Sequence, residues 1–200
     1  MSSKVINVVF GRDLKTVRSK RASVAPYTFI KNTKTGKYEL FVLMGIHAKS
    51  GEVTDFGGGV KKDECDLQAS LRELNEETFE MFNKVSMEYI ESCVAITRPA
   101  YETVIKPTNT KVRTEGISTI FLPVSNEQFE RASTEFKKLA SNDSDREIRE
   151  IMWVKGCEIL KPTTKDYKVW SFLRKFYYES LSPELNEMLF ARWCTSAPIV

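Results

Sequence analysis

Short apolar runs alternate with longer amphipathic stretches along this chain of 200 residues. The apolar runs are rich in valine, isoleucine and aromatic residues, which is typical of β-strands. They predict strands over residues 5–10, 24–30, 38–46, 89–96, 101–105, 117–124 and 148–154. Residues 32–36, Asn-Thr-Lys-Thr-Gly, have the composition of a turn, so the second and third of these strands are expected to pair as a hairpin.

Helical spacing of apolar residues predicts the remaining elements. One helix starts at about Leu67 with Asp66 as its N-cap, and others cover residues 126–140, 167–181 and 183–193, with a polar loop at 141–145. We expect a single domain over residues 1–200. Residues 1–23 would supply an N-terminal strand and a basic connection, and residues 163–200 would be helices appended to the domain and packed on it.

Composition narrows the class of protein. A hydrophobic content of 42% suffices for a buried core, and 30 basic against 27 acidic residues leave a net charge of only +3, too small to indicate a nucleic-acid binder. The four cysteines lack the paired spacing of zinc or redox sites and are interpreted as reduced thiols. No apolar run reaches the ~18 residues of a membrane span, so we expect a cytoplasmic protein without a membrane partner. The oligomeric state is left open.

The helix that starts near Leu67 carries an unusual acidic face. On a helical wheel, the apolar positions cluster about 120° away from a group of four carboxylates, which are Glu73, Glu76, Glu77 and Glu80. Most charged faces are simply solvated, and exposed like charges at this spacing cost only a few tenths of a kcal/mol each.

The glycines before this helix favour a functional interpretation. Gly57, Gly58 and Gly59 allow the backbone to approach a ligand closely and lead directly into the acidic helix. Divalent cations such as Mg²⁺ prefer oxygen ligands and fill their remaining positions with water and phosphate oxygens. Arg72 is expected to hold a carboxylate such as that of Glu64 or Glu76 in a bidentate pair and so orient the ligands.

The same stretch resembles the signature of the Nudix hydrolases. That signature has a glycine, five residues, a glutamate and seven residues, followed by arginine, glutamate, an apolar residue, any residue and two glutamates. The positions that match it in register are Gly58, Glu64, Arg72, Glu73, Leu74, Glu76 and Glu77. The late segment EIREIMWV is also similar to a family strand that ends in Trp-Val. The resemblance implies an α/β/α sandwich around a mixed sheet and leaves the C-terminal helices unexplained.

Two positions depart from the signature. Phe79 stands where the family has glycine, and Glu80 stands where it has an apolar residue. The glycine lets the helix end in a left-handed turn, which costs a bulky residue roughly 1–2 kcal/mol. We therefore expect the helix to continue past Phe79, to about Asn83.

The resemblance implies hydrolysis of a nucleoside diphosphate linked to another group, with Mg²⁺ or Mn²⁺ as cofactor. By position, Glu73, Glu76, Glu77 and the Gly58 carbonyl would ligate the metal, and Glu64 and Arg72 would support the ligands. The general base varies in the family. Glu147, just before the strand at 148–154, is our prediction, with Glu150 and Glu115 as alternatives.

The sequence leaves the substrate open. Capped RNA is the leading candidate, because Arg18, Lys20 and Arg21 could form an RNA path together with an aromatic and basic helix that carries Trp170, Arg174, Lys175, Tyr177 and Tyr178. Each segment is also compatible with an ordinary solvated loop or a core-packed helix. The alternatives are a dinucleoside polyphosphate, a nucleotide sugar, a diphosphoinositol phosphate, or a nucleotide- or RNA-binding module without activity. His47, the only histidine, has no motif around it that favours nucleophilic catalysis.

Overall fold

The computed structural model describes residues 6–82, 84–98, 116–140 and 146–196. Within these residues eight strands form one sheet, and a two-stranded hairpin lies apart from it. The sheet strands are β1 (Asn7–Phe10), β2 (Arg21–Lys31), β3 (Tyr38–His47), β4 (Val53–Thr54), β5 (Phe56–Gly59), β6 (Val94–Arg98), β7 (Ile117–Pro123) and β8 (Ile148–Lys155), and the hairpin pairs β9 (Thr163–Thr164) with β10 (Tyr167–Lys168).

The sheet is mixed. Its main path runs β1-β6-β7-β2-β3-β4, with β5 added to β2 and β8 added to β3. The β2–β7 pair is parallel and the other sheet pairs are antiparallel, including the predicted β2–β3 hairpin. Since β2 pairs with β7 and β5, and β3 pairs with β4 and β8, these two strands form the centre on which the glycine loop is built.

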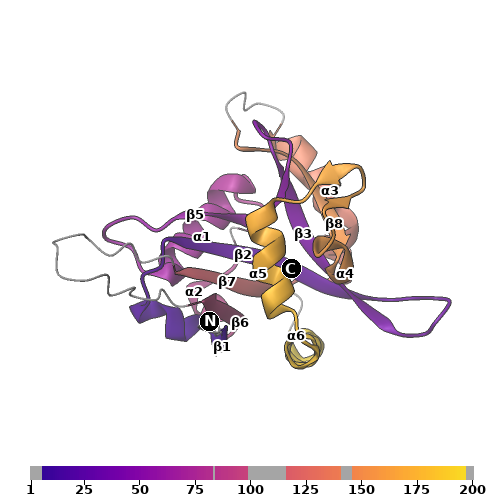
Figure 1. The fold of residues 1–200 in the computed structure, drawn as a ribbon, viewed down its shortest axis with the longest axis horizontal. Coiled ribbons are helices and arrows are strands. Elements are labelled where there is room, and N and C mark those ends of the chain that lie inside the picture. The colour runs from indigo at the N-terminus through magenta and orange to yellow at the C-terminus, as the bar shows by residue number, and fades with distance from the viewer. Residues whose placement is uncertain (1–5, 83, 99–115, 141–145, 197–200) are drawn as a thin grey trace, which may run out of the picture.

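Helices cover both faces of the sheet (Figure 1). They are the 3₁₀ helix η1 (Gly11–Thr16), α1 (Asp66–Glu77), α2 (Met87–Glu91), α3 (Asn126–Ala140), α4 (Gly156–Ile159), α5 (Ser171–Ser180) and α6 (Pro183–Thr195). Val24 of β2 packs in one core with residues of α1, α2 and α3, whereas its neighbour Ala25 packs in a second core with residues of α5 and α6. Successive strand residues point to opposite faces, so this split produces the expected α/β/α sandwich.

The C-terminal helices pack on the sheet. The Tyr27 hydroxyl of β2 donates a hydrogen bond of 2.9 Å to the Leu189 carbonyl of α6, and the Trp193 indole donates one of 3.1 Å to the Val124 carbonyl. In Figure 1, α5 crosses the face of the sheet opposite α1. The described part of the chain has no helix both long and apolar enough to traverse a lipid bilayer.

Several predicted boundaries are wrong. Residues 89–91 belong to α2 instead of a strand, because the Ser86 hydroxyl caps this helix by accepting from the Tyr89 amide at 3.2 Å. The segment expected to be helical from 167 begins with β10, and α5 starts at Ser171. The predicted strand at 101–105 and the loop at 141–145 lie outside the described residues. All four cysteines are free thiols, as predicted.

The start of α1 also differs from the prediction. Cys65 is the N-cap, and Asp66 is the first helical residue. The Asp66 carboxylate is fully buried and accepts hydrogen bonds from the Ser19 amide at 2.6 Å and the Ser118 hydroxyl at 2.5 Å. Its partners lie in distant segments, so Asp66 ties α1 to the sheet instead of capping the helix.

The expected extension of α1 past Phe79 is wrong as well. The helix ends at Glu77, and Phe79 and Glu80 have left-handed φ values of 52° and 58°. The Glu80 amide donates to the Asn75 carbonyl at 2.8 Å, the six-to-one bond that closes a helix end. The Phe79 ring packs edge-on against Phe136 of α3, with centroids 5.5 Å apart. This contact helps to offset the cost of the left-handed turn.

Candidate metal-binding and catalytic site

The glycine loop on β5 lies directly against β2 and α1. Gly57 pairs with Ser23 of β2, and a Cβ at Gly57 would lie only 2.3 Å from the Ser23 Cβ. A Cβ at Gly58 would lie 2.5 Å from a carboxylate oxygen of Glu73. Gly57 is therefore required by the sheet, whereas Gly58 leaves room for the Glu73 carboxylate beside the backbone.

Arg72 organises the acidic residues around this loop. Its guanidinium holds Glu64 in the predicted bidentate pair, with distances of 2.6 and 2.9 Å. It also donates to Glu73 at 2.6 Å, to Glu76 at 3.0 Å and to the Gly59 carbonyl at 3.1 Å. Hydrogen bonding from Arg72 lowers the pKa of Glu64 to about 2. Glu64 therefore stays ionised and fixes the orientation of Arg72.

Glu77 is the most perturbed carboxylate of the group. It is 8% exposed, and one of its oxygens accepts a hydrogen bond of 2.6 Å from the Gly57 amide. Burial raises the pKa of Glu77 to about 9, the nearby carboxylates of Asp55 and Glu73 add to this effect, and Arg21 opposes it. The ionised form of Glu77 is thus disfavoured by burial more strongly than Arg21 and the Gly57 amide favour it.

The acidic residues open into a cavity of about 180 Å³ at the C-terminal half of α1. Its lining residues are Glu73, Glu76, Glu77, Phe79, Arg146, Glu147 and Ile148. The Glu147 carbonyl accepts from the Ala48 amide at 2.6 Å where β8 begins to pair with β3. The structure thus brings Glu147 together with the three motif glutamates, although 70 positions of sequence separate it from Glu77.

Sequence reasoning missed Arg146. Among the described residues that line the cavity it is the one basic residue, and one of its amino groups donates to the Ala140 carbonyl at 2.7 Å. No motif marks this arginine in the sequence, and only its position next to Glu147 could have suggested it. Its guanidinium gives the cavity a positive group that can face a phosphate.

The donor set fits a hard divalent cation in its chemistry. In the described residues no three histidine, cysteine, aspartate or glutamate side chains are already gathered as a metal site, because Arg72 and the Gly57 amide hold the carboxylates. Burial nevertheless disfavours the ionised form of Glu77 in the absence of a cation, and an Asp55 carboxylate oxygen is buried without a hydrogen-bond partner. A cation near Glu77 would relieve both.

The alternative bases are placed differently. Glu150 does not line the cavity, and its carboxylate accepts from the Tyr167 hydroxyl at 3.2 Å. Glu115 lies outside the described residues. His47 accepts from the Ser50 amide through Nδ1 at 3.1 Å in a surface turn and also does not line the cavity.

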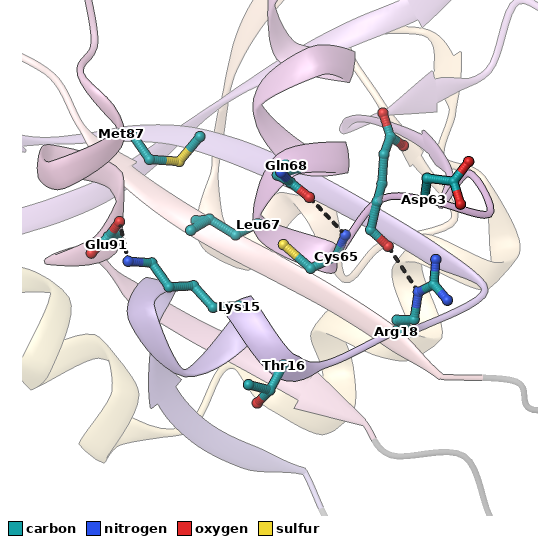
Figure 2. A pocket seen from close by; sticks show the side chains of 10 residues that line it. Lys15, Thr16, Arg18, Asp63, Cys65, Leu67, Gln68, Met87 and Glu91 are labelled. Atoms are coloured by element: carbon teal, nitrogen blue, oxygen red, sulfur yellow. Dashed lines mark hydrogen bonds and ion pairs between the residues drawn. The ribbon is translucent and has the colours of Figure 1, made fainter.

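The basic segment before β2 does not form one continuous basic surface. Arg18 donates to the Glu64 backbone carbonyl at 3.0 Å, and Lys15 pairs with Glu91 at 2.6 Å. Arg18, Lys15 and Glu91 border an open cavity of about 510 Å³, which is drawn in Figure 2. Lys20 is exposed. The cavity in Figure 2 is lined by acidic as well as basic side chains, so its charge does not single out a polyanion.

Arg21 corrects the prediction of an RNA path. Its side chain is only 14% exposed, forms an ion pair of 2.7 Å with the fully buried Asp55, and donates to the Gly57 carbonyl at 2.9 Å. Arg21 therefore belongs to the support of the glycine loop. Its partners come from β5 and the residue before it, and nothing in the basic run 12–21 distinguishes this arginine from its neighbours.

The aromatic and basic helix is mainly a packing element. Tyr177 is fully buried in the core between the sheet and α5, whereas Tyr178 is 74% exposed. Trp170 is half-buried and stacks on Arg21 and Phe172, with 5.4 Å to the Arg21 guanidinium carbon and 5.1 Å between ring centroids. Of the predicted aromatics, only Tyr178 stands clear on the surface.

The chain matches no protein-family model and no curated protein. Among solved structures it is similar to a MutT/Nudix family protein of Listeria innocua, at 19% identity and a TM-score of 0.47 over 88% of this chain and 99% of that one. An Ap4A hydrolase of C. elegans in a binary complex gives 14% identity and a TM-score of 0.45 over 86% and 98%. The Nudix hydrolase RenU of M. smegmatis gives 11% identity and a TM-score of 0.47 over 88% of each chain. Likenesses this distant do not by themselves assign a family or a substrate.

Proposed function

We propose that this protein is a Nudix-type pyrophosphohydrolase that depends on a divalent cation, Mg²⁺ or Mn²⁺. The observation that carries the proposal is the cavity in which Glu73, Glu76, Glu77 and Glu147 meet beside the glycine loop. These residues comprise the three motif glutamates of α1 together with the base predicted from outside the motif. The substrate class is a nucleotide-type pyrophosphate.

Each residue has a role in this proposal. Glu73, Glu76, Glu77 and the Gly58 carbonyl would hold the cation, which when bound neutralises pyrophosphate oxygens and lowers the pKa of water. Glu64 and Arg72 keep the carboxylates in place through their bidentate pair. Glu147 would take the proton of the attacking water, and Arg146 would contact a phosphate oxygen and stabilise the charge that develops there.

Substitution of Glu76 offers the sharpest test of the site. Its side chain is 57% exposed, so Glu76→Gln removes a ligand charge at little structural cost. Turnover of a pyrophosphate substrate should fall at least about 100-fold. Glu80→Gln is the matched control, because Glu80 is an exposed acid just past the same helix and does not line the cavity. Equal turnover in both variants would contradict the metal site.

Capped RNA remains our specific candidate, and a small nucleotide remains the alternative. The exposed side chains of Arg18 and Lys20 favour RNA, because both flank the loop that carries Glu64 and Arg18 is bonded to it. The paired Lys15 and the buried Arg21 weaken that argument. A small substrate requires the cavity and the loop alone.

Salt dependence separates the two substrates. Arg18→Gln combined with Lys20→Gln should slow cleavage of capped RNA at least about tenfold and flatten its salt dependence, with cleavage of a free cap dinucleotide little changed. Unchanged RNA cleavage and salt slope would remove these residues from the RNA path, and a wild-type preference for the dinucleotide would favour the small-nucleotide alternative. Metal-dependent nucleotide binding without any turnover would indicate a binding module.

A further inference from the structure

A buried ion pair lies beneath the glycine loop. Arg21, the first residue of β2, pairs with Asp55, which is fully buried just before β5, at 2.7 Å. The Arg21 Nη1 and Asp55 Oδ2 atoms are buried without hydrogen-bond partners. A buried ion pair of this kind usually contributes little to folding or opposes it, since desolvation of two charges offsets their attraction. Its presence therefore calls for a reason other than stability.

The pair connects directly to the metal-binding carboxylates. Arg21 donates to the Gly57 carbonyl at 2.9 Å, and the amide of the same glycine donates to Glu77 at 2.6 Å. Arg21 therefore fixes one side of the Gly57 backbone while Glu77 is held by the other. A shift of the guanidinium would move the Gly57 peptide, and with it the donor that orients Glu77.

Helix α5 completes this arrangement from the other side of the sheet. The Trp170 ring covers the Arg21 guanidinium at 5.4 Å, and the Trp170 amide donates to the Val53 carbonyl at 3.1 Å. Val53, which lies two residues before Asp55, also forms a parallel bridge with Val169. The start of α5 is thus attached to the segment that carries Asp55, and its tryptophan limits where Arg21 can lie.

We propose that Arg21 and Asp55 are positioning residues for the metal site, and that Trp170 holds them in register so that the appended α5 is part of the catalytic unit. This inference rests on the proposed function in assigning Glu77 to the metal. The chain of contacts is Trp170 to Arg21, Arg21 to Gly57, and Gly57 to Glu77. Arg21 is not among the residues that line the cavity, and its hydrogen bond to Gly57 connects it to the backbone that holds Glu77.

Arg21→Lys tests the proposal while it preserves the charge opposite Asp55. Lysine lacks the planar fork that reaches Asp55 and Gly57 together. The matched control is Arg98→Lys, because Arg98 is also buried, pairs with Glu179 of α5 at 2.8 Å and lies over Phe172 and Phe176, away from the glycine loop. Both variants weaken a contact between the sheet and α5. Only Arg21→Lys disturbs the path to Glu77.

Two measurements are made on each variant of the full chain. The first is Mn²⁺ affinity without substrate, read by the loss of the free-ion paramagnetic resonance signal, and the second is the Mg²⁺ concentration for half-maximal turnover. For Arg21→Lys the dissociation constant for Mn²⁺ and the half-maximal Mg²⁺ concentration should each rise at least fivefold, which means that metal binding weakens. For Arg98→Lys both values should stay within twofold of wild type. In a Glu77→Gln background the effect of Arg21→Lys on Mn²⁺ affinity should shrink below twofold, because the two residues act in series.

Trp170→Leu keeps the inference testable if Arg21→Lys does not fold. It removes the ring that covers the guanidinium and leaves both charges in place, and metal affinity should weaken at least threefold. Wild-type metal affinity in the folded Arg21→Lys variant, or in Trp170→Leu if it alone folds, would overturn the inference. A wild-type protein that binds Mn²⁺ through Glu76 but hydrolyses no pyrophosphate would instead overturn the proposed function, and the affinity comparison would still stand.

Discussion

Glu77→Gln should stabilise the metal-free protein while it destroys activity. Burial raises the pKa of Glu77 from an ordinary value of 4.5 to about 9, so the folded chain binds a proton that the unfolded chain releases. A carboxyl group with a raised folded-state pKa contributes stability that is fully present below its ordinary pKa and is lost as the pH rises toward the folded value. Between pH 4.5 and 9, wild-type stability should therefore decline.

The magnitude follows from the same shift. At about pH 7.5, which is roughly 3 pH units above the ordinary pKa, retention of this proton lowers the free energy of unfolding by about 1.4 kcal/mol per unit. The total loss is up to ~4 kcal/mol. Arg21 and Asp55 interact electrostatically with Glu77, so the three groups titrate together and we expect about 2–4 kcal/mol in practice. Glutamine carries no proton to lose and still accepts the Gly57 amide, so Glu77→Gln should escape this cost.

Urea unfolding in a chelator, followed from about pH 4.5 to 8.5, measures the effect. The stability gain of Glu77→Gln over wild type should be near zero at the acidic end and grow with pH. Glu76→Gln, with its more exposed side chain, should change stability by less than about 0.5 kcal/mol throughout. A gain that does not vary with pH would refute the reasoning. In millimolar Mg²⁺ wild type should become more stable than Glu77→Gln, because only wild type keeps the full set of metal ligands.

Two further substitutions test the glycine loop and the end of α1. Gly58→Ala would place a Cβ 2.5 Å from the Glu73 carboxylate, so turnover should fall at least about tenfold. In the control Gly59→Ala the new Cβ meets nothing within 4 Å, and turnover should stay within about twofold of wild type. Equal turnover in the two variants would contradict the close contact at Gly58. Glu80→Gly removes a side chain from a left-handed position with a φ of 58° and should raise stability by about 0.5–1 kcal/mol in thermal unfolding; a clear loss would show that the turn is not formed in solution.

The sequence alone determined those features that depend on neighbouring residues. Hairpin strands β2 and β3 and helix α3 lie where the pattern placed them, because alternation and helical spacing are local signals. A bidentate pair of Arg72 with a motif carboxylate was also predictable, and the structure selects Glu64 over Glu76 as the bidentate partner.

The tertiary structure decided what depends on distant contacts. The turn at Phe79 is accompanied by ring packing on Phe136, which propensity within the helix does not include. The Arg21 side chain is only 14% exposed because Asp55, 34 positions later, supplies its counter-charge. Arg146 lines the same cavity as Glu77 because β8 pairs with β3 and places the start of β8 beside α1. Local sequence patterns do not encode such long-range pairings, and these pairings determine which charges surround the site.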